Sequence, residues 1–182
     1  MDEPRPTAGT PEKTPPMKTT TSARITPFFW FDDQAEEAAN FYTSIFPDSK
    51  ILHVNRYPKE VAQATGRKEG AVMTISFVLD GQEFSALNGG PAFKFTEALS
   101  LVIHCANQDE VDHYWERLRD GGDERAQQCG WLKDKFGVSW QIVPDDLQAL
   151  LGDPDPNRAR RAGEAMMGMK KLDIAALRRA AG

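Results

Sequence analysis

The order of elements along the chain is repeated, and this repeat limits the fold more than any other feature. Asp33-Gln34-x-Glu36 in the first half returns as Asn107-Gln108-x-Glu110, 74 positions later. In both halves an apolar run precedes the motif, apolar residues at helical spacing follow it, and strand-like segments come next. Two copies of strand–helix–strand–strand–strand predict an α+β protein built from paired βαβββ modules, and this order does not fit a doubly wound parallel sheet.

The first copy begins with the apolar, aromatic run 25–31, which predicts a strand. Asp33 is a favourable N-cap, with a glutamate at the capping-box position, so a helix should begin here and end at Pro47. Three more strands are expected, over 50–57, 71–79 and 82–88. The last two are joined at Asp80-Gly81, a strong hairpin-turn pair. The polar stretch 58–70 is predicted to be a loop, mobile enough to act as a lid.

The second copy repeats this plan. The run 99–105 predicts a strand, Asn107 caps a helix, and Gly121-Gly122 ends that helix. Between the cap and the glycines, apolar residues recur at helical spacing, at Val111, Tyr114, Trp115 and Leu118. Further strands are expected over 126–130, 131–133 and 138–143.

The chain before the repeat has a different composition. The first sixteen positions hold five of the twelve prolines, and residues 1–23 contain no Trp or Phe. Such a segment buries too little surface to offset its ordering entropy, so we predict a disordered tail over 1–23. We do not decide between Met1 and Met17 as the native start. The repeat is assigned to a domain over 24–144, with module one over 24–95 and module two over 96–144.

Residues 145–182 are predicted to form a helical extension, with short helices over 157–169 and 173–181. Between Asp153 and Gly182 the extension has seven Lys or Arg against four Asp or Glu. We expect it to pack on its own domain or on a partner subunit, and the alternative is a basic patch for nucleic acid.

Composition limits the class of protein. A formal charge of −5 argues against a general nucleic-acid binder, and no apolar run approaches the ~20 residues that a membrane span needs. Two cysteines make neither a disulfide framework nor a four-cysteine zinc site. We therefore predict a cytoplasmic protein that binds neither nucleic acid nor membranes.

Three segments resemble the PhnB-like family of the vicinal oxygen chelate superfamily, which includes glyoxalase I, bleomycin-resistance proteins and extradiol dioxygenases. They are ITPFFWFDDQAEEAANFYTSIFP (25–47), LNGGPAFKF (87–95) and QCGWLKDKFGVSWQIVP (128–144). The terminal KKLDIAALRRA (170–180) is typical of one branch. The resemblance implies paired βαβββ modules whose sheets curl into a half-open barrel, usually in a homodimer. Whether the modules pair within one chain or exchange between subunits stays open.

In this superfamily a divalent metal is held by His and Glu side chains at four equivalent strand positions. The resemblance maps these positions onto Thr26, a residue at or beside Ala86, Ser100 and Gln141. None of these is His, Asp or Glu, so they supply neither imidazole nor negative charge. We therefore expect no metal site and no cofactor.

Some family members carry the label 3-demethylubiquinone 3-methyltransferase. A standard S-adenosylmethionine enzyme needs a glycine-rich turn after a parallel strand, and the fourteen glycines include no G-x-G. The label is kept as an alternative only.

Strand alternation indicates which side chains face the cavity. Phe28 and Trp30 share the face of Thr26, and His104 shares that of Ser100. Asn88 follows Ala86 on one face and is expected to form a neutral polar cluster with Ser100 and Gln141. The predicted ligand-binding residues are Phe28, Trp30, Asn88, Ser100, His104, Cys129 and Gln141. Aromatic walls with a few neutral polar groups suit a small, partly apolar, uncharged molecule. Each residue also has an ordinary alternative: core packing for the aromatics and Cys129, solvation for His104, and mutual hydrogen bonding for the polar groups.

Three functions follow as hypotheses. The first is a metal-independent small-molecule-binding protein that works as a homodimer, with no catalytic residue assigned. The second is an enzyme of the same superfamily, either a lyase, isomerase or dioxygenase with an unmapped metal or the labelled methyltransferase. The third is a regulatory or interaction module that uses the basic C-terminal tail.

Overall fold

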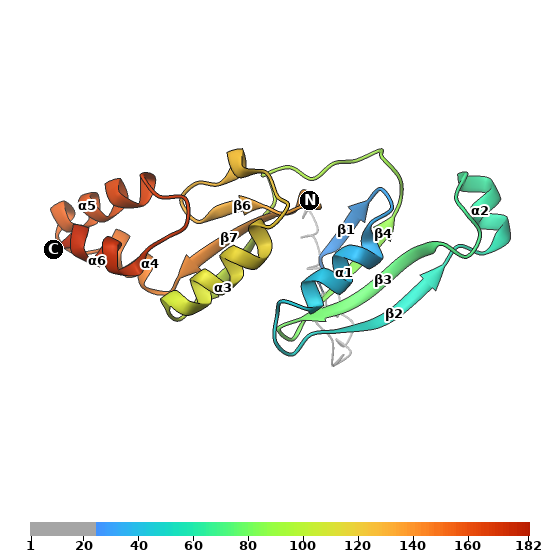
Figure 1. The fold of residues 1–182 in the computed structure, drawn as a ribbon, viewed down its shortest axis with the longest axis horizontal. Coiled ribbons are helices and arrows are strands. Elements are labelled where there is room, and N and C mark those ends of the chain that lie inside the picture. Colours follow the sequence, from blue (N-terminus) through green and yellow to red (C-terminus); the bar gives the residue numbers. More distant parts are fainter. Residues whose placement is uncertain (1–24) are drawn as a thin grey trace, which may run out of the picture.

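The computed structural model describes residues 25–182, so the predicted disordered tail over 1–23 lies outside the described residues. The molecule is elongated, with module one, module two and the C-terminal helices following one another along its long axis (Figure 1). None of the helices in residues 25–182 combines the length and the apolar character that crossing a bilayer requires.

Module one contains four strands and two helices. They are β1 (Phe28–Phe31), α1 (Ala35–Thr43), β2 (Lys50–Arg56), α2 (Lys59–Thr65), β3 (Val72–Leu79) and β4 (Gln82–Asn88). The strand order is β1-β4-β3-β2, with β1 parallel to β4 and the other pairs antiparallel. The four strands predicted for this half of the chain are confirmed.

Module two has the same plan with one strand fewer. It contains β5 (Leu101–Cys105), α3 (Gln108–Arg119), β6 (Trp131–Lys133) and β7 (Ser139–Pro144). The order β5-β7-β6, with β5 parallel to β7, repeats β1-β4-β3 of module one. The α+β class predicted from the repeat is confirmed.

The strand expected over 126–130 is not formed. Glu124–Ala126 is a single 3-10 turn, and Gln128 makes only an isolated bridge to Trp131. Cys129 and Gly130 both adopt positive φ, 52° and 83°, which a strand cannot contain. The fourth strand of the βαβββ plan is therefore missing from module two.

The loop expected over 58–70 is also a wrong prediction, because α2 occupies Lys59–Thr65. Ala62 is the single buried residue of α2, so the sequence there lacks the repeated apolar positions from which a helix is predicted. Gly66 ends the helix in the left-handed conformation (φ 69°), the usual position for a terminating glycine.

The two helix starts differ. Asn107 caps α3 as expected, its side chain accepting a hydrogen bond from the Glu110 amide. Asp33 does not cap α1: the N-cap residue is Gln34, and no side-chain cap comes from it. The first amide of α1, that of Ala35, instead donates a 2.8 Å hydrogen bond to the distant side chain of Asn88.

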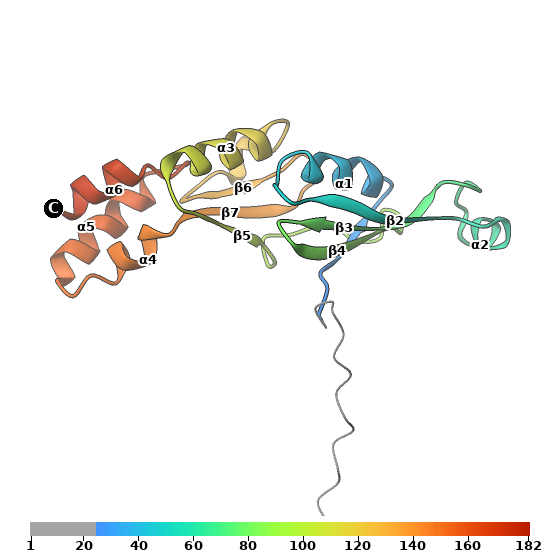
Figure 2. The same cartoon turned by 90° about the horizontal axis from the view of Figure 1, so that it is seen from below.

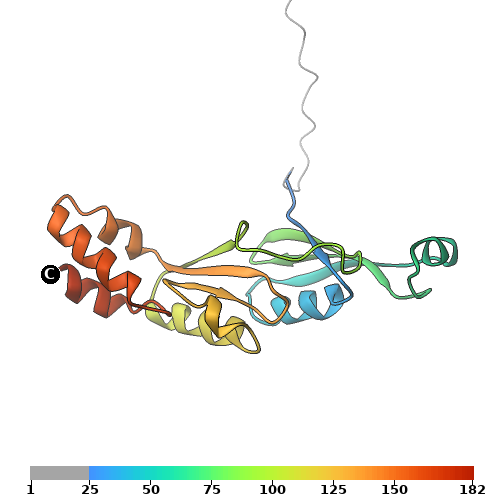
Figure 3. The same cartoon turned by 90° about the horizontal axis from the view of Figure 1, so that it is seen from above.

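Both sheets carry their helix on the same side (Figures 2 and 3). The helix-facing side chains are buried and alternate with more exposed ones; on β1 these are Phe29 and Phe31, and on β5 they are Ile103 and Cys105. Within residues 25–182 no helix packs across the opposite face of either sheet, and we call these surfaces the open faces. Phe28, 59% exposed, lies on the open face of module one, and Val102, 46% exposed, on that of module two.

Aromatic rings from both modules form one shared core. Tyr42 and Phe46 of module one lie against Trp140, with ring centroids 5.4 and 5.5 Å apart. Phe31 and Phe41 contact Phe136 in the β6–β7 turn. The two modules are therefore packed together and not merely linked.

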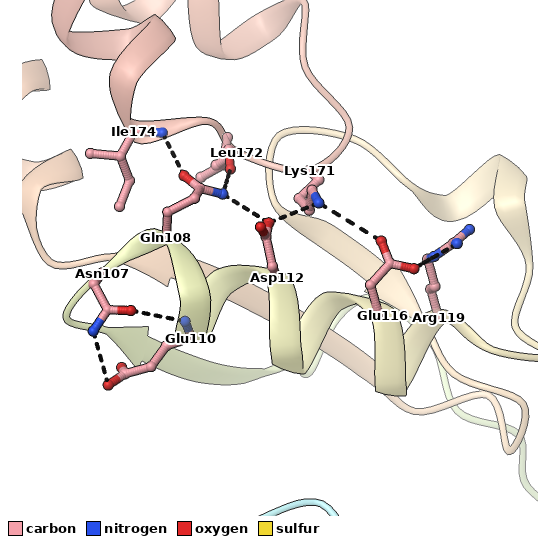
Figure 4. A network of polar contacts seen from close by, with 9 residues as sticks. All are labelled: Asn107, Gln108, Glu110, Asp112, Glu116, Arg119, Lys171, Leu172 and Ile174. Carbon is pink, nitrogen blue, oxygen red and sulfur yellow. Dashed lines mark hydrogen bonds and ion pairs between the residues drawn. The ribbon is translucent and has the colours of Figure 1, made fainter.

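The C-terminal extension consists of α4 (Asp146–Leu151), α5 (Pro156–Met167) and α6 (Ile174–Ala181), which confirms the helices expected over 157–169 and 173–181. The segment before α6 is fastened to α3 (Figure 4). The Gln108 amide donates to the Leu172 carbonyl at 3.1 Å and accepts from the Ile174 amide at 2.9 Å. Lys171 pairs with Asp112 at 2.8 Å. The extension thus packs on its own domain.

Candidate ligand pocket

A pocket of about 630 Å³ lies on the open face of module one, at the end of the sheet next to α2, which contributes Val61 and Thr65 to the pocket wall. Its volume is in the range of small-molecule sites. It is lined by Trp30, Tyr57, Val61, Thr65, Arg67, Met73, Leu87 and the loop residues Gly89, Gly90, Pro91 and Ala92. Of the residues predicted to bind a ligand, Trp30 alone lines this pocket.

Trp30 is held in the pocket wall by the loop that follows β4. Its indole Nε1 donates a 2.8 Å hydrogen bond to the Gly90 carbonyl. The ring lies so close to Gly89 that an added Cβ would be 2.2 Å from it. Phe93 supports the ring edge-on at a centroid distance of 4.9 Å. Gly89 is therefore needed to seat this indole.

Asn88 does not contribute to the pocket, and its predicted grouping with Ser100 and Gln141 is wrong. It is 7% exposed and lies on the helix-facing side of β4. Its Oδ1 accepts from the Ala35 amide at 2.8 Å, and its Nδ2 donates to the Val72 carbonyl at 3.1 Å. Asn88 is thus the missing cap of α1.

The same observation corrects the face assigned to β4. Ala86 is fully buried and pairs with the buried Phe29, so its face is turned to the helix. Ser85 and Leu87 lie on the open face, paired with Phe28 and Trp30. Leu87, which lines the pocket, was missed because the opposite alternation was chosen for this strand.

Tyr57 and Arg67 were also missed. Tyr57 is buried and donates to the Asn88 carbonyl at 2.6 Å, which ties the segment leading into α2 to the end of β4. Arg67 directly follows the glycine that ends α2. Gly66, which follows a polar stretch, was a sequence sign that a short helix ends there. The helix lies between Tyr57 and Arg67, and both residues line the pocket.

Ser100 and Gln141 lie together on the open face of module two, as predicted. Gln141 Nε2 donates to Ser100 Oγ at 2.8 Å. His104, on the same strand face as Val102, is exposed, with Nδ1 4.0 Å from an Asp145 carboxylate oxygen. These residues do not share the pocket of Trp30 within one chain. Their roles in ligand binding stay predictions.

A smaller pocket of about 310 Å³ lies at the junction of the modules. The β3–β4 hairpin contributes Leu79, Asp80 and Gln82 to it, and β5 contributes a run that ends at His104. Its walls include Phe46, Phe84, Tyr114 and Trp140. Since these rings form the shared core, this pocket is a seam between the modules.

The cysteines have different surroundings. Cys129 lies against the C-terminal extension: its Sγ is 3.7 Å from Met167 Sδ, and its amide donates to the Met169 carbonyl at 2.8 Å. It therefore lies outside the pocket of Trp30, and its predicted ligand contact stays untested. Cys105 is buried in the core, and this burial raises the pKa of its thiol to about 12.

The residues at the four mapped metal positions do not fit a divalent cation. Thr26 and Ser100 offer hydroxyls, Gln141 offers an amide that is bonded to Ser100, and Ser85 is the open-face neighbour of Ala86. Divalent metals in such sites are held by imidazole or carboxylate groups, which this set lacks. Across residues 25–182 no three His, Cys, Asp or Glu side chains gather into a possible metal site.

Comparison with known proteins agrees with this architecture. The family model described as 3-demethylubiquinone-9 3-methyltransferase matches residues 23–143. The PhnB protein from Bacillus cereus is 37% identical with a TM-score of 0.59, and the match covers 67% of this chain and 99% of that one. A Pseudomonas aeruginosa protein is 18% identical with a TM-score of 0.53, covering 68% of this chain and 98% of that one. No curated protein matches.

The paired modules and their open faces define a protein of the vicinal oxygen chelate fold. Within that superfamily, the chain belongs to the family of the 3-demethylubiquinone-9 3-methyltransferase model, the PhnB-like proteins. The resemblance noted from the sequence is thereby confirmed. The match ends before α4, so the extension α4–α6 lies outside the family model.

Proposed function

We propose that this protein binds a small, partly apolar molecule without a metal ion, in the pocket beside Trp30. The observation that carries the proposal is the built wall of that pocket. Gly89 makes room for the Trp30 indole, the Gly90 carbonyl accepts its N–H, and Met73 and Leu87 add apolar side chains from the open face. Such a concave, largely apolar surface with few polar groups is typical of small-molecule sites.

Metal-dependent chemistry receives no support from the side chains. The four mapped positions carry hydroxyl, amide and methyl groups, which hold a divalent cation poorly. The methyltransferase label receives none either, because residues 25–182 form two small mixed sheets and not the parallel sheet that cradles S-adenosylmethionine.

We further propose that the working unit is a homodimer in which the open faces of two chains cover each other. Within one chain these faces point to the same side and cannot close a cavity (Figure 2). Phe28 and Val102 are large apolar residues left exposed there. A second copy would cover them and bring Ser100 and Gln141 of one chain toward the Trp30 pocket of the other.

Thermal denaturation with a panel of small aromatic alcohols, amides and acids tests the proposal. At least one compound should raise the midpoint equally with and without a chelator, since binding to the native state alone stabilises it. Trp30→Ala should abolish the shift, whereas Leu99→Ala, an exposed residue outside the pocket, should keep it. A shift that disappears with the chelator would contradict metal independence.

Two further measurements separate the alternatives. Calorimetry with S-adenosylmethionine tests the methyltransferase label, and binding of that cofactor would overturn the proposal. Removal of residues 152–182 tests the interaction-module alternative. The extension is clamped to α3 of its own chain by Gln108 and Lys171, so we expect its loss to lower stability and leave ligand binding in place.

A further inference from the structure

We infer that the pocket beside Trp30 takes a molecule with one oxyanion at the end of an apolar body, and that Arg67 binds the oxyanion. The inference rests on the proposed function and replaces the uncharged ligand expected from the sequence. It depends on three features of Arg67: where the fold holds it, what pairs with it, and what lies beside it.

The fold holds the Arg67 guanidinium at the pocket wall. Its backbone amide donates to the Ala62 carbonyl at 2.9 Å, which fixes it to the end of α2. Its Nη2 lies against Gly90, where an added Cβ would be only 2.1 Å away. Gly89 and Gly90 thus serve two neighbouring side chains: one admits the indole of Trp30 and the other admits this guanidinium.

The charge of Arg67 is only loosely paired. The side chain is 24% exposed, and its ion pair with Asp32 spans 3.8 Å, longer than a hydrogen bond. The Asp32 side chain is itself half exposed, and such pairs contribute little. Among residues 25–182 no acceptor takes a hydrogen bond from the Arg67 side chain. A guanidinium has five donors, so a mostly buried one without acceptors can bind an anion.

The surroundings specify the rest of the ligand. Trp30, Met73 and Leu87 line the same pocket and would contact an apolar body. The planar fork of arginine matches the two oxygens of a carboxylate or a sulfonate, and such charge-assisted pairs are the stronger hydrogen bonds. Arg67 is the one charged residue of the pocket lining, so one oxyanion is matched and a second would have no partner there.

Two fluorescent probes that differ by one group test the inference. 8-Anilinonaphthalene-1-sulfonate carries a sulfonate, and N-phenyl-1-naphthylamine is the same aromatic amine without it. Arg67→Gln should weaken sulfonate binding roughly tenfold, which corresponds to ~1.4 kcal/mol, and leave the neutral probe within about twofold. Trp30→Phe should weaken both. Arg56→Gln removes a nearby arginine outside this pocket and should change neither.

Two further readouts are measured on the wild-type protein. Higher ionic strength should weaken binding of the sulfonate probe and spare the neutral one, since salt screens the attraction between the cationic site and the free anion. Both probes should shift the indole N–H signal of Trp30 in a nitrogen–proton spectrum, assigned by its loss in Trp30→Phe.

The outcomes distinguish the two proposals. If both probes bind at Trp30 and Arg67→Gln affects them equally or not at all, the oxyanion inference is overturned and the binding function stands. If neither probe moves the Trp30 signal nor responds to Trp30→Phe, both are overturned.

Discussion

The hydroxyl of Tyr42 donates a 2.7 Å hydrogen bond to the carboxylate of Asp134, and this bond joins α1 of module one to the β6–β7 turn of module two. Asp134 is 3% exposed and accepts three more bonds, from the Trp140 indole and from the amides of Phe136 and Val138. Burial raises the pKa of both Tyr42 and Asp134, while the four donors act in the opposite direction on the carboxyl. The junction between the modules thus contains a buried carboxylate with a full set of donors.

Removing the Tyr42 hydroxyl should therefore lower stability. Tyr42→Phe leaves a buried carboxylate one donor short and should cost about 1.5–3 kcal/mol of unfolding free energy, measured by urea denaturation. Tyr114→Phe is the matched control, because the Tyr114 ring stacks on Phe46 and its hydroxyl makes no hydrogen bond within residues 25–182. Equal losses in the two variants would show that the bond to Asp134 does not stabilise the junction.

Acid should weaken the attachment of the C-terminal extension. The Asp112 carboxylate accepts hydrogen bonds from Lys171 and Gln108, and these bonds lower its pKa. A lowered folded-state pKa contributes stability above the unfolded value, about 3.9, and this contribution is lost as the pH falls toward the folded-state pKa. Wild-type protein should lose more stability between pH 5 and pH 3 than Asp112→Asn does. The difference should be below about 1 kcal/mol, because the pair is partly exposed. Identical pH profiles would contradict this role of Asp112.

The two thiols should react differently with an aromatic disulfide reagent. The thiolate is the reactive form, and Cys105 is buried with a pKa raised to about 12, whereas Cys129 is partly exposed. We expect one thiol per native chain to react and two after unfolding. Cys129→Ser should leave the native protein unreactive, and Cys105→Ser should leave one reactive thiol. Labelling of native Cys105 would show that the core opens around it.

The sequence was sufficient for features that depend on neighbouring residues. Alternation placed Phe28 and Trp30 on one face of β1, and it placed Ser100, just before β5, on the same face as His104. The Asn107 cap of α3 was predicted from a local motif. It was insufficient where distant segments meet. The amide of Ala35 is capped by Asn88, and the surroundings of Cys129 come from Met167 and Met169. The exposure of Arg67 to the pocket depends on Gly90. None of these partners lies within the few residues over which periodicity and capping rules operate.

Gly89 should be the most sensitive position of the pocket wall. An alanine there would place Cβ 2.2 Å from the Trp30 ring, so the indole must move and its hydrogen bond to Gly90 must stretch. Gly89→Ala should cost about 1–3 kcal/mol in urea denaturation, the usual range for an overpacked site, and should move the Trp30 indole N–H signal. Gly163→Ala is the control. This glycine lies within α5, and an added Cβ would be 3.8 Å from Leu151 Cδ2, an ordinary contact, so the substitution should be neutral or stabilise by about 0.5–1 kcal/mol.

The open faces provide the test of the proposed homodimer. Val102 lies on β5 of module two, 46% exposed, and pairs with Gln141 across the sheet. If a second copy covers this face, Val102→Lys buries a charge without a partner, which is far more costly than leaving it in water. Light scattering after size-exclusion chromatography should then give the mass of a monomer, against a dimer for the wild type. Leu151→Lys changes a similarly exposed apolar residue on α4, away from both sheets, and should stay dimeric. Wild-type protein that elutes as a monomer at every concentration would rule out the proposed dimer, and the open face of module one would then have to bind its ligand alone.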